Sequence, residues 1–487
     1  MAEVTAIPGS TRSAIPARLD ALPWSRWHWR VVLALGVSWL LDGLEVTVVG
    51  SLGPALQRPD TLGLSASEIG WAASAYIGGA VLGALVFGRL ADRLGRKRIF
   101  LVTLAVYLVA TMLTSFSPGL AWFALCRFAT GFGIGGEYAA INSAIDELIP
   151  ARVRGRVDLA INGSFWIGAA MGAALSLLLL NDSLFDPNLG WRFAFALGGI
   201  LGLAILLVRR HLPESPRWLL MHGRQAEAQA IVEDIERQIE REHGPLRLPD
   251  DLHFQKSLKS VPWKTIVTLL ATRYRRRTAL GLSLMAAQAF FYNAIFFTYA
   301  LVLTRFYGVP AQSVGYYIFP FAVGNFLGPL LLGHLFDAVG RRRMIALTYL
   351  VSGVGLFFTG YGFSLDSLSA AQLTLCWSLI FLVASAAASS AYLTVSEIFP
   401  LEMRAVSISL FYAAGTALGG FAGPPLFGAM IESGSRGGLF GAYSFAAALM
   451  CGAALAAAYL GIDAERRSLE SVAPPLGSDP GESAPPD

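Results

Sequence analysis

Ionisable residues stand inside long apolar stretches of this 487-residue chain. Asp42 and Glu45 are three residues apart in the stretch 31–56, on one face of the expected helix, and Arg127 lies in the stretch 119–145. An ionised side chain in hydrocarbon costs roughly 2.5–3.5 kcal/mol on insertion scales, so each of the three needs a partner or a function. Two carboxylates so close together cannot both ionise cheaply in an apolar medium. We therefore expect one of them to carry a proton at neutral pH, which is the requirement for a proton-coupled step.

The depths of these residues predict a pairing. At about 1.5 Å per residue, Asp42 lies ~16 Å and Glu45 ~21 Å above the start of their stretch, and Arg127 lies ~12 Å from the opposite face. A buried guanidinium seldom stands alone, so Glu45 is the expected counter-ion of Arg127. Protonation of Glu45 would release Arg127 and switch the helices between two arrangements. The competing interpretation is a solvent-lined carboxylate pair near a helix end.

A further carboxylate, Glu137, lies ten residues after Arg127 in the same stretch. Two interpretations are equally open. Glu137 is either a second proton site or the cap of a bend among the glycines at 131, 133, 135 and 136.

The second half of the chain has neutral polar and aromatic residues at its centre instead of charges. We expect four of them to bind a small polar substrate through hydrogen bonds and ring stacking: Gln288, Tyr292, Asn293 and Tyr392. The alternative role for such residues is hydrogen bonding between helices.

The apolar stretches that carry these polar and charged residues are expected to be helices that cross a membrane. The chain is 55% hydrophobic and 14% charged, against about 25% charged residues in soluble domains. A soluble helical protein would have to bury nearly every face of its helices, which excludes that class. Twelve apolar stretches are long enough to cross a hydrocarbon core of about 30 Å. They lie near 31–56, 68–91, 98–117, 119–145, 156–181, 190–210, 278–304, 312–335, 343–363, 370–396, 405–430 and 438–462.

The cationic residues predict the orientation. All but five of the 37 Lys and Arg lie in the two termini or in the connections that share their side of the membrane. Loops rich in Lys and Arg stay inside, so both termini are expected in the cytoplasm. The predicted organisation is a cytoplasmic arm, a six-helix bundle, a cytoplasmic loop with amphipathic helices, a second six-helix bundle and a disordered cytoplasmic tail. Their ranges are 1–30, 31–210, 211–277, 278–462 and 463–487.

Two short motifs occur twice. GRLADRLGRKR begins at Gly88 and GHLFDAVGRRR at Gly333, while ELIPARVRG begins at Glu147 and EIFPLEMRA at Glu397. The offsets of 245 and 250 residues are nearly equal. Two motifs that repeat at almost one offset indicate a duplicated six-plus-six membrane protein. Within the second half, the prolines in 423–425 predict a kink or an unwound turn.

The sequence lacks the motifs that usually mark ATP hydrolysis, nucleophilic catalysis and metal binding. The sequence has no GxxxxGK[ST] loop for ATP and no GxSxG nucleophile motif, and its six His show no metal-ligand spacing. We therefore expect no enzyme activity, no cofactor and no metal.

These motifs resemble those of the major facilitator superfamily over nearly the whole chain. The resemblance implies an all-α membrane fold of twelve transmembrane helices in two pseudo-symmetric six-helix bundles. It also implies a cytoplasmic gate in which aspartates bind helix N-termini and arginines hold the inner side shut. The implied gate residues are Gly88, Asp92, Arg93, Gly95, Arg96, Glu147, Arg154, Asp337, Arg341, Glu397 and Arg404.

Within the superfamily, PESPRWLL from Pro213 and RFATGFGIGG around Arg127 resemble the sugar porters and their metabolite:proton symporter relatives. Gln288 and Asn293 match two positions of the sugar-binding QQxxGxN pattern, but Ala287 and Phe291 replace its first Gln and its Gly. We expect the bulky Phe291 to fill the space that a hexose needs. DGLE from Asp42 is similar to the DGxD motif of aromatic-acid:proton symporters.

The sequence thus predicts a proton-coupled symporter of a small organic metabolite, most closely an organic or aromatic acid, that works by alternating access. Asp42, Glu45, Arg127 and Glu137 are the predicted coupling residues. The expected location is the plasma membrane, here a bacterial inner membrane, and the expected state is a monomer without nucleic-acid partners. Three alternatives remain: a sugar or polyol:proton symporter, a proton-driven exporter of organic compounds, and a transport-dead solute sensor.

Overall fold

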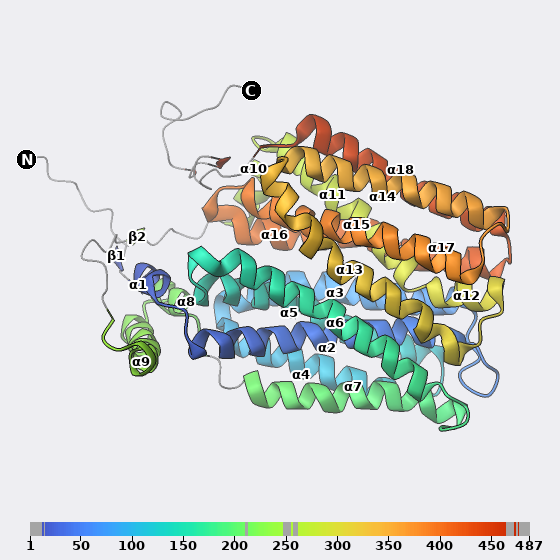
Figure 1. The fold of residues 1–487 in the computed structure, drawn as a ribbon. Helices are drawn as coiled ribbons and strands as arrows, with labels where there is room; N and C mark the ends of the chain where they lie inside the picture. Colours follow the sequence, from blue (N-terminus) through green and yellow to red (C-terminus); the bar gives the residue numbers. More distant parts are fainter. Residues whose placement is uncertain are drawn as a thin grey trace, which may run out of the picture.

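The computed structural model describes residues 12–13, 15–209, 213–246, 255–256, 262–463, 472–473 and 476. Long helices run nearly parallel through the molecule, and a group of shorter helices stands beyond one end of them (Figure 1). A two-stranded antiparallel pair, β1 (Arg12–Ser13) with β2 (Gln255–Lys256), joins the N-terminal segment to the central loop.

The long helices of the first half follow the predicted stretches in order. They are α2 (Arg26–Leu56), α3 (Ala66–Leu94), α4 (Arg96–Thr114), α5 (Leu120–Leu148), α6 (Ala151–Leu179) and α7 (Pro187–Arg209). Those of the second half are α11 (Arg275–Phe296), α12 (Tyr299–Tyr307), α13 (Val314–Ala338), α14 (Arg341–Ser364), α15 (Ala370–Glu397), α16 (Leu401–Gly415), α17 (Gly423–Glu432) and α18 (Arg436–Leu460). The shorter elements are α1 (Ile15–Ala21), α8 (Pro216–Met221), α9 (Gln225–His243), α10 (Trp263–Ala271), the 3-10 turn η1 (Ala311–Ser313) and the π-helical turn η2 (Thr416–Gly420).

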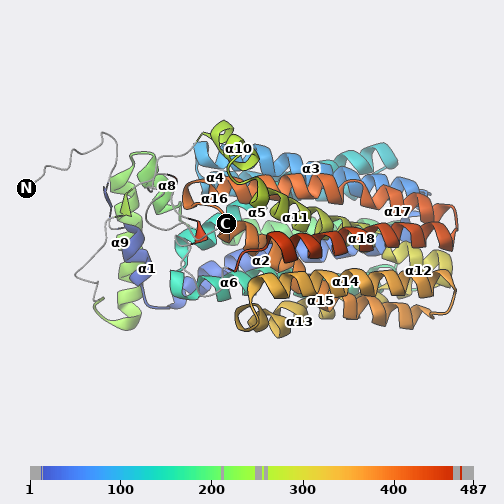
Figure 2. The same ribbon diagram turned by 90° about the horizontal axis from the view of Figure 1, so that it is seen from above.

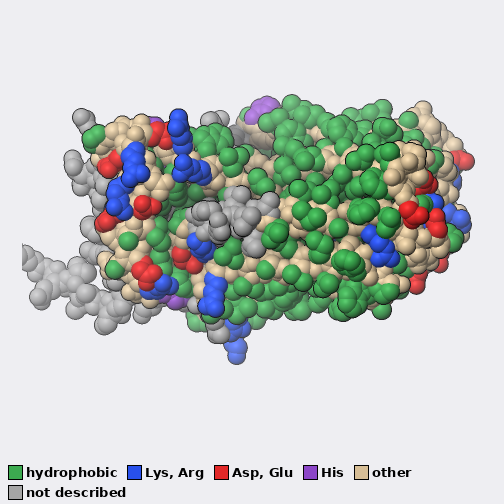
Figure 3. Space-filling view, turned by 90° about the horizontal axis from the view of Figure 1, so that it is seen from below, with side chains coloured by type: hydrophobic (Ala, Val, Ile, Leu, Met, Phe, Trp, Pro, Cys, Tyr) green, Lys and Arg blue, Asp and Glu red, His purple; other side chains and the backbone are tan. Residues whose placement is uncertain are grey.

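The predicted all-α membrane fold is confirmed. Among the described residues, ten helical segments are long and apolar enough to cross a membrane. Two more helices, α5 and α7, include residues whose side chains are not described, and they occupy the fourth and sixth predicted spans. Hydrophobic side chains cover the middle of the molecule and charged side chains gather at its ends (Figure 3). This surface matches a bilayer with water on both sides.

Two predicted spans are broken helices. The stretch 278–304 is divided into α11 and α12 at Phe297 and Thr298. The stretch 405–430 is divided into α16, η2 and α17, and the second break precedes Pro424 and Pro425. Proline cannot donate a backbone hydrogen bond and collides with the preceding turn, which accounts for the interruption predicted there. Broken helices within a membrane supply both polar backbone and a place to bend.

Each half packs mainly within itself. In the first half, α3 lies along α5 and α2 lies along α6; in the second, α14 lies along α18 and α13 along α15. The halves meet where α6 contacts α13 and where α3 contacts α17. Figure 2 shows the same bundle from above.

The N-terminal segment docks on the central loop. Ile15, Leu19 and Leu22 are buried against the apolar face of α9, whose Val232 and Ile239 are fully buried. Arg18 binds Glu236 through two hydrogen bonds of 2.8 and 2.5 Å. This contact raises the pKa of Arg18, chiefly through the hydrogen bond to Glu236. Both predicted cytoplasmic segments therefore contribute to one small core at the base of α2, which includes Trp27.

Release of α1 from this core is testable by proteolysis. Leu19→Asn places a polar amide where Leu19 is 3% exposed, so trypsin cleavage after Arg18 should accelerate at least about tenfold, the factor that corresponds to 1.4 kcal/mol. Arg237→Gln, on the exposed face of α9, is the matched control and should leave the rate unchanged. Equal cleavage rates in the wild type and Leu19→Asn would contradict the docking.

Candidate functional site

The centre of the first half holds a buried ion pair. Arg127 Nη1 on α5 donates to Glu45 Oε1 on α2. The two side chains are 1% and 3% exposed. The structure thus brings together the two residues that the sequence paired by depth.

Aromatic rings and helix backbones enclose this pair. The Arg127 guanidinium lies 4.7 Å from the ring centroid of Tyr76 on α3 and 5.7 Å from that of Phe195 on α7. Among the described residues, Arg127 Nε, Arg127 Nη2 and Glu45 Oε2 have no hydrogen-bond partner. The two charges therefore depend heavily on each other, and loss of one leaves the other uncompensated in an apolar site.

Glycines allow α3 and α5 to approach closely enough to hold this geometry. A Cβ at Gly131 would collide with the Tyr76 carbonyl, and one at Gly135 would collide with the Ala80 carbonyl. Backbone contact between the two helices sets Tyr76 beside Arg127. Helix α5 continues without a break through Glu137, which is 8% exposed. The glycines therefore serve packing, and the role of Glu137 stays a prediction.

Asp42 lies one helical turn below Glu45 and is 8% exposed. It is close enough to Tyr412 on α16 for an electrostatic interaction. The Tyr412 ring lies 6.4 Å from the Tyr392 ring on α15, and the Gln288 side chain lies near the Tyr392 phenol. Polar groups from both halves thus adjoin at the centre.

The other two predicted substrate residues lie one turn further along α11. The Tyr292 hydroxyl donates to Asn325 Oδ1 at 2.8 Å, and its ring lies 6.0 Å from that of Trp166 on α6. Asn293 Nδ2 donates to the Ala289 carbonyl of its own helix at 2.8 Å. Sequence reasoning missed Trp166, Asn325 and Tyr412, because each stands alone in an apolar stretch and only the packing of helices brings it to the centre.

The structure shows the surroundings of Phe291, and its effect on a bound hexose stays a prediction. Its side chain is 0% exposed and stacks on Phe381 with ring centroids 4.5 Å apart. The side chain thus lies within the apolar core of the second half.

Part of the predicted gate is described at the end that the sequence predicts to be cytoplasmic. Arg341 Nη2 lies 3.2 Å from Glu397 Oε1. Gly95 and Gly340 occupy matching places in the repeated motif, with φ of 100° and 112°, and each links two helices by a turn that favours glycine. Gly88 has no atom within 4 Å of an added Cβ. The side chains of the other predicted gate residues lie outside those described: Asp92, Arg93, Arg96, Glu147, Arg154, Asp337 and Arg404.

At the opposite end the two halves are sealed together. Glu432 Oε2 on α17 accepts from the Ser67 N–H at the start of α3 at 3.1 Å. A Cβ on Gly428 would stand 2.5 Å from the Ala66 carbonyl, and one on Gly70 would stand 2.5 Å from the Pro424 carbonyl. Because the predicted orientation puts this end outside the cell, we call this contact between α3 and α17 the outer seal. Its backbone-to-backbone packing closes this end of the interface.

A membrane protein with two packed halves, a sealed end and a polar centre between the halves has the architecture of an alternating-access transporter. The chain matches the family described as "Sugar (and other) transporter" over residues 27–470, and it belongs to that family of the major facilitator superfamily. It is therefore a multi-pass secondary transporter of small metabolites and not an enzyme.

Known relatives cover nearly the whole chain. The niacin transporter NiaP of Acinetobacter baylyi is 27% identical over 462 residues, which are 94% of this chain and 99% of that protein. The 4-hydroxybenzoate transporter PcaK of the same organism is 26% identical over 404 residues, with 82% and 84% covered. The xylose transporter XylE of E. coli, in a partially occluded inward-open conformation, shares the fold with a TM-score of 0.70 at 19% identity. That match covers 88% of this chain and 97% of XylE.

The close packing of the outer seal predicts what happens when one of its glycines is replaced by a larger residue. Gly428→Val would force α17 away from the Ala66 carbonyl, so the outer end should stay open and transport should fall at least about tenfold. Gly441→Val, where an added Cβ meets no atom within 4 Å, is the control. Cysteine accessibility at Ser67 measures the opening, and an unchanged accessibility in Gly428→Val would refute the seal.

Proposed function

We propose that this protein imports a small organic acid with an aromatic ring together with protons. The observation that carries this proposal is the buried pair of Glu45 and Arg127. Removal of one partner from a buried ion pair costs about 3–5 kcal/mol, because the other charge is left uncompensated. Protonation of Glu45 has the same electrical effect as such a removal. The arrangement of helices around the intact pair therefore loses stability when a proton binds, and a different arrangement becomes favoured.

The structure that contains the intact pair also has the outer seal closed. In the proposed cycle, a proton from outside reaches Glu45 when the seal is open and leaves toward the cytoplasm after the seal has closed. Asp42 lies a turn closer to the cytoplasmic end and would pass the proton on. Glu137, lower still on α5, would be a second acceptor on that path.

The substrate would bind between the halves. Its ring would pack on the aromatic side chains there, Trp166, Tyr292, Tyr392 and Tyr412, and Gln288 and Asn293 would form hydrogen bonds. Arg127 is enclosed and paired, so we assign it to coupling and not to contact with the substrate. Relatives named for niacin and 4-hydroxybenzoate, both aromatic acids, favour this class over sugars.

The distribution of Lys and Arg supports a proposal for the orientation in the membrane. The cationic connections lie at the end that carries α1, α8 and α9, so this end would face the cytoplasm in a bacterial inner membrane. The gate would close there through Arg341 and Glu397 and their counterparts in the first half. The protein would act as a monomer, since one chain supplies both halves. A proton-driven exporter would use the same residues. Whether the protein imports or exports its solute would then depend on the direction of the proton gradient.

Uptake into proteoliposomes tests the proposal. Radiolabelled niacin, 4-hydroxybenzoate, xylose and carnitine are offered with and without an inward proton gradient. We expect the gradient to drive accumulation of an aromatic acid, and Glu45→Gln to reduce that accumulation at least about tenfold because it removes the titrating group. Exchange of the solute across the membrane without a gradient should persist.

Glu233→Gln, an exposed carboxylate on α9, is the control and should transport normally. Gradient-driven accumulation that survives in Glu45→Gln would show that Glu45 is not the coupling residue. A protein that binds the solute without moving it would instead be a sensor.

A further inference from the structure

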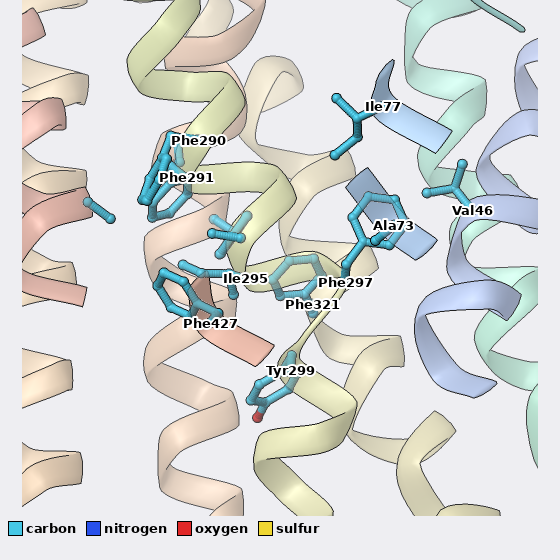
Figure 4. Close-up of a cluster of buried hydrophobic side chains, with 14 of the residues drawn as sticks. Val46, Ala73, Ile77, Phe290, Phe291, Ile295, Phe297, Tyr299, Phe321 and Phe427 are labelled. Atoms are coloured by element: carbon cyan, nitrogen blue, oxygen red, sulfur yellow. The ribbon is translucent and has the colours of Figure 1, made fainter. Parts of the chain in front are cut away.

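The ion pair contacts the second half of the protein through two aromatic rings. Tyr76 on α3 lies beside the Arg127 guanidinium. Its ring also packs against Phe297, with centroids 6.1 Å apart in an edge-to-face arrangement. Figure 4 shows Phe297 reaching from the α11–α12 break to α3, where it lies near Ala73. One tyrosine thus connects the buried charge of the first half to the broken helix of the second.

We propose that Tyr76 and Phe297 are positioning residues that transmit the protonation state of Glu45 to the outer seal. This inference rests on the proton coupling proposed above. Arg127 is held by the Glu45 carboxylate and by the Tyr76 and Phe195 rings. When Glu45 gains a proton, the carboxylate no longer fixes the guanidinium, and its position against Tyr76 changes.

Close packing carries that change across the interface. Tyr76 is 8% exposed and Phe297 is 5% exposed, so neither ring can turn into open space. A tightly packed interior transmits such a displacement, because it offers few voids that could absorb it. Phe297 stands between two helices rather than inside one, and a break in the hydrogen-bond ladder bends more easily than a continuous helix.

The break lies next to the contacts that close the outer end. The Phe296 carbonyl is 3.2 Å from where a Cβ on Gly50 would stand, and Leu301 lies against Gly53. Helix α12 also packs on α17, which forms the outer seal. A shift at Phe297 therefore alters the fit of α12 to α2 and of α17 to α3 together.

Other titratable groups lie close to the pair or to its nearest neighbours, and they enter any pH response. They are Asp42 on α2, Tyr107 on α4, Glu137 on α5 and Tyr412 on α16, in addition to Tyr76 on α3. Helix α7 presents the Phe195 ring to the guanidinium. The test therefore replaces Glu45 itself and does not depend on pH alone.

The experiment measures the opening of the outer end and needs no substrate. Cys126, Cys376 and Cys451 are replaced by Ser, and spin labels are placed at Ser183 and Ser433, which are exposed at the outer ends of the two halves. Distances between the labels are then measured at pH 8 in the full-length protein. Glu45→Gln, which resembles the protonated form, should raise the open-to-closed ratio about tenfold.

The relay is tested in the Glu45→Gln background. Adding Tyr76→Leu or Phe297→Leu should return the distances to those of the wild type, whereas Tyr76→Phe keeps the ring and should retain the open state. Phe306→Leu, an aromatic residue of α12 that packs on Phe363, is the matched control and should also retain it. Melting temperatures of all variants separate a relay from general loss of stability.

Two results would overturn the inference. If both leucine variants open as fully as Glu45→Gln alone, Tyr76 and Phe297 transmit nothing, while the proposed proton coupling still stands. If Glu45→Gln does not change the distances at all, the coupling proposed for Glu45 fails and the relay fails with it.

Discussion

A guanidinium and a carboxylate in the middle of a membrane protein form a constraint that the surrounding helices must satisfy. Arg127 and Glu45 are almost completely enclosed, and breaking a pair of this kind costs about 3–5 kcal/mol. The pair is neutral as a whole, so it is stable only while both partners keep their charges and their contact. Four helices meet around it: α2 and α5 carry the charges, and α3 and α7 supply the rings. The close approach of α3 to α5 depends on glycines whose replacement would separate the two helices.

In the proposed function the two halves have different roles, one in proton coupling and one in solute binding, which the duplicated motifs do not reveal. Charge is concentrated in the first half, where the Tyr76 ring stands between Arg127 and Phe297 of the second half. The interface itself is lined by neutral polar groups and rings, among them Tyr292, Tyr392 and Tyr412. Such a surface can hold and release a solute without the desolvation cost of burying a fixed charge at each turnover. The two broken helices of the second half lie along this surface and provide the bends that opening requires.

Much of the fold follows from the sequence, because hydrophobic length and paired motifs report directly on membrane helices. The spans, the duplication and the pairing of Arg127 with Glu45 by depth could all be predicted in this way. Periodicity could not separate α11 from α12, since the residues at that break are as apolar as their neighbours. The sequence also could not show that the Phe291 side chain stacks on Phe381, because that contact depends on the rotation of α11. Trp166 and Tyr412 join the site through tertiary packing alone, which no local pattern records.

The central claim is that protons and solute move together through the charge state of Glu45. The most direct measurement follows the internal pH of proteoliposomes with a trapped dye after an aromatic acid, such as 4-hydroxybenzoate, is added outside at equal pH. Liposomes without protein correct for passive diffusion of the neutral acid. The account predicts rapid internal acidification with the wild type and none above the protein-free rate with Glu45→Gln. Solute entry at the wild-type rate without any accompanying proton movement would contradict it.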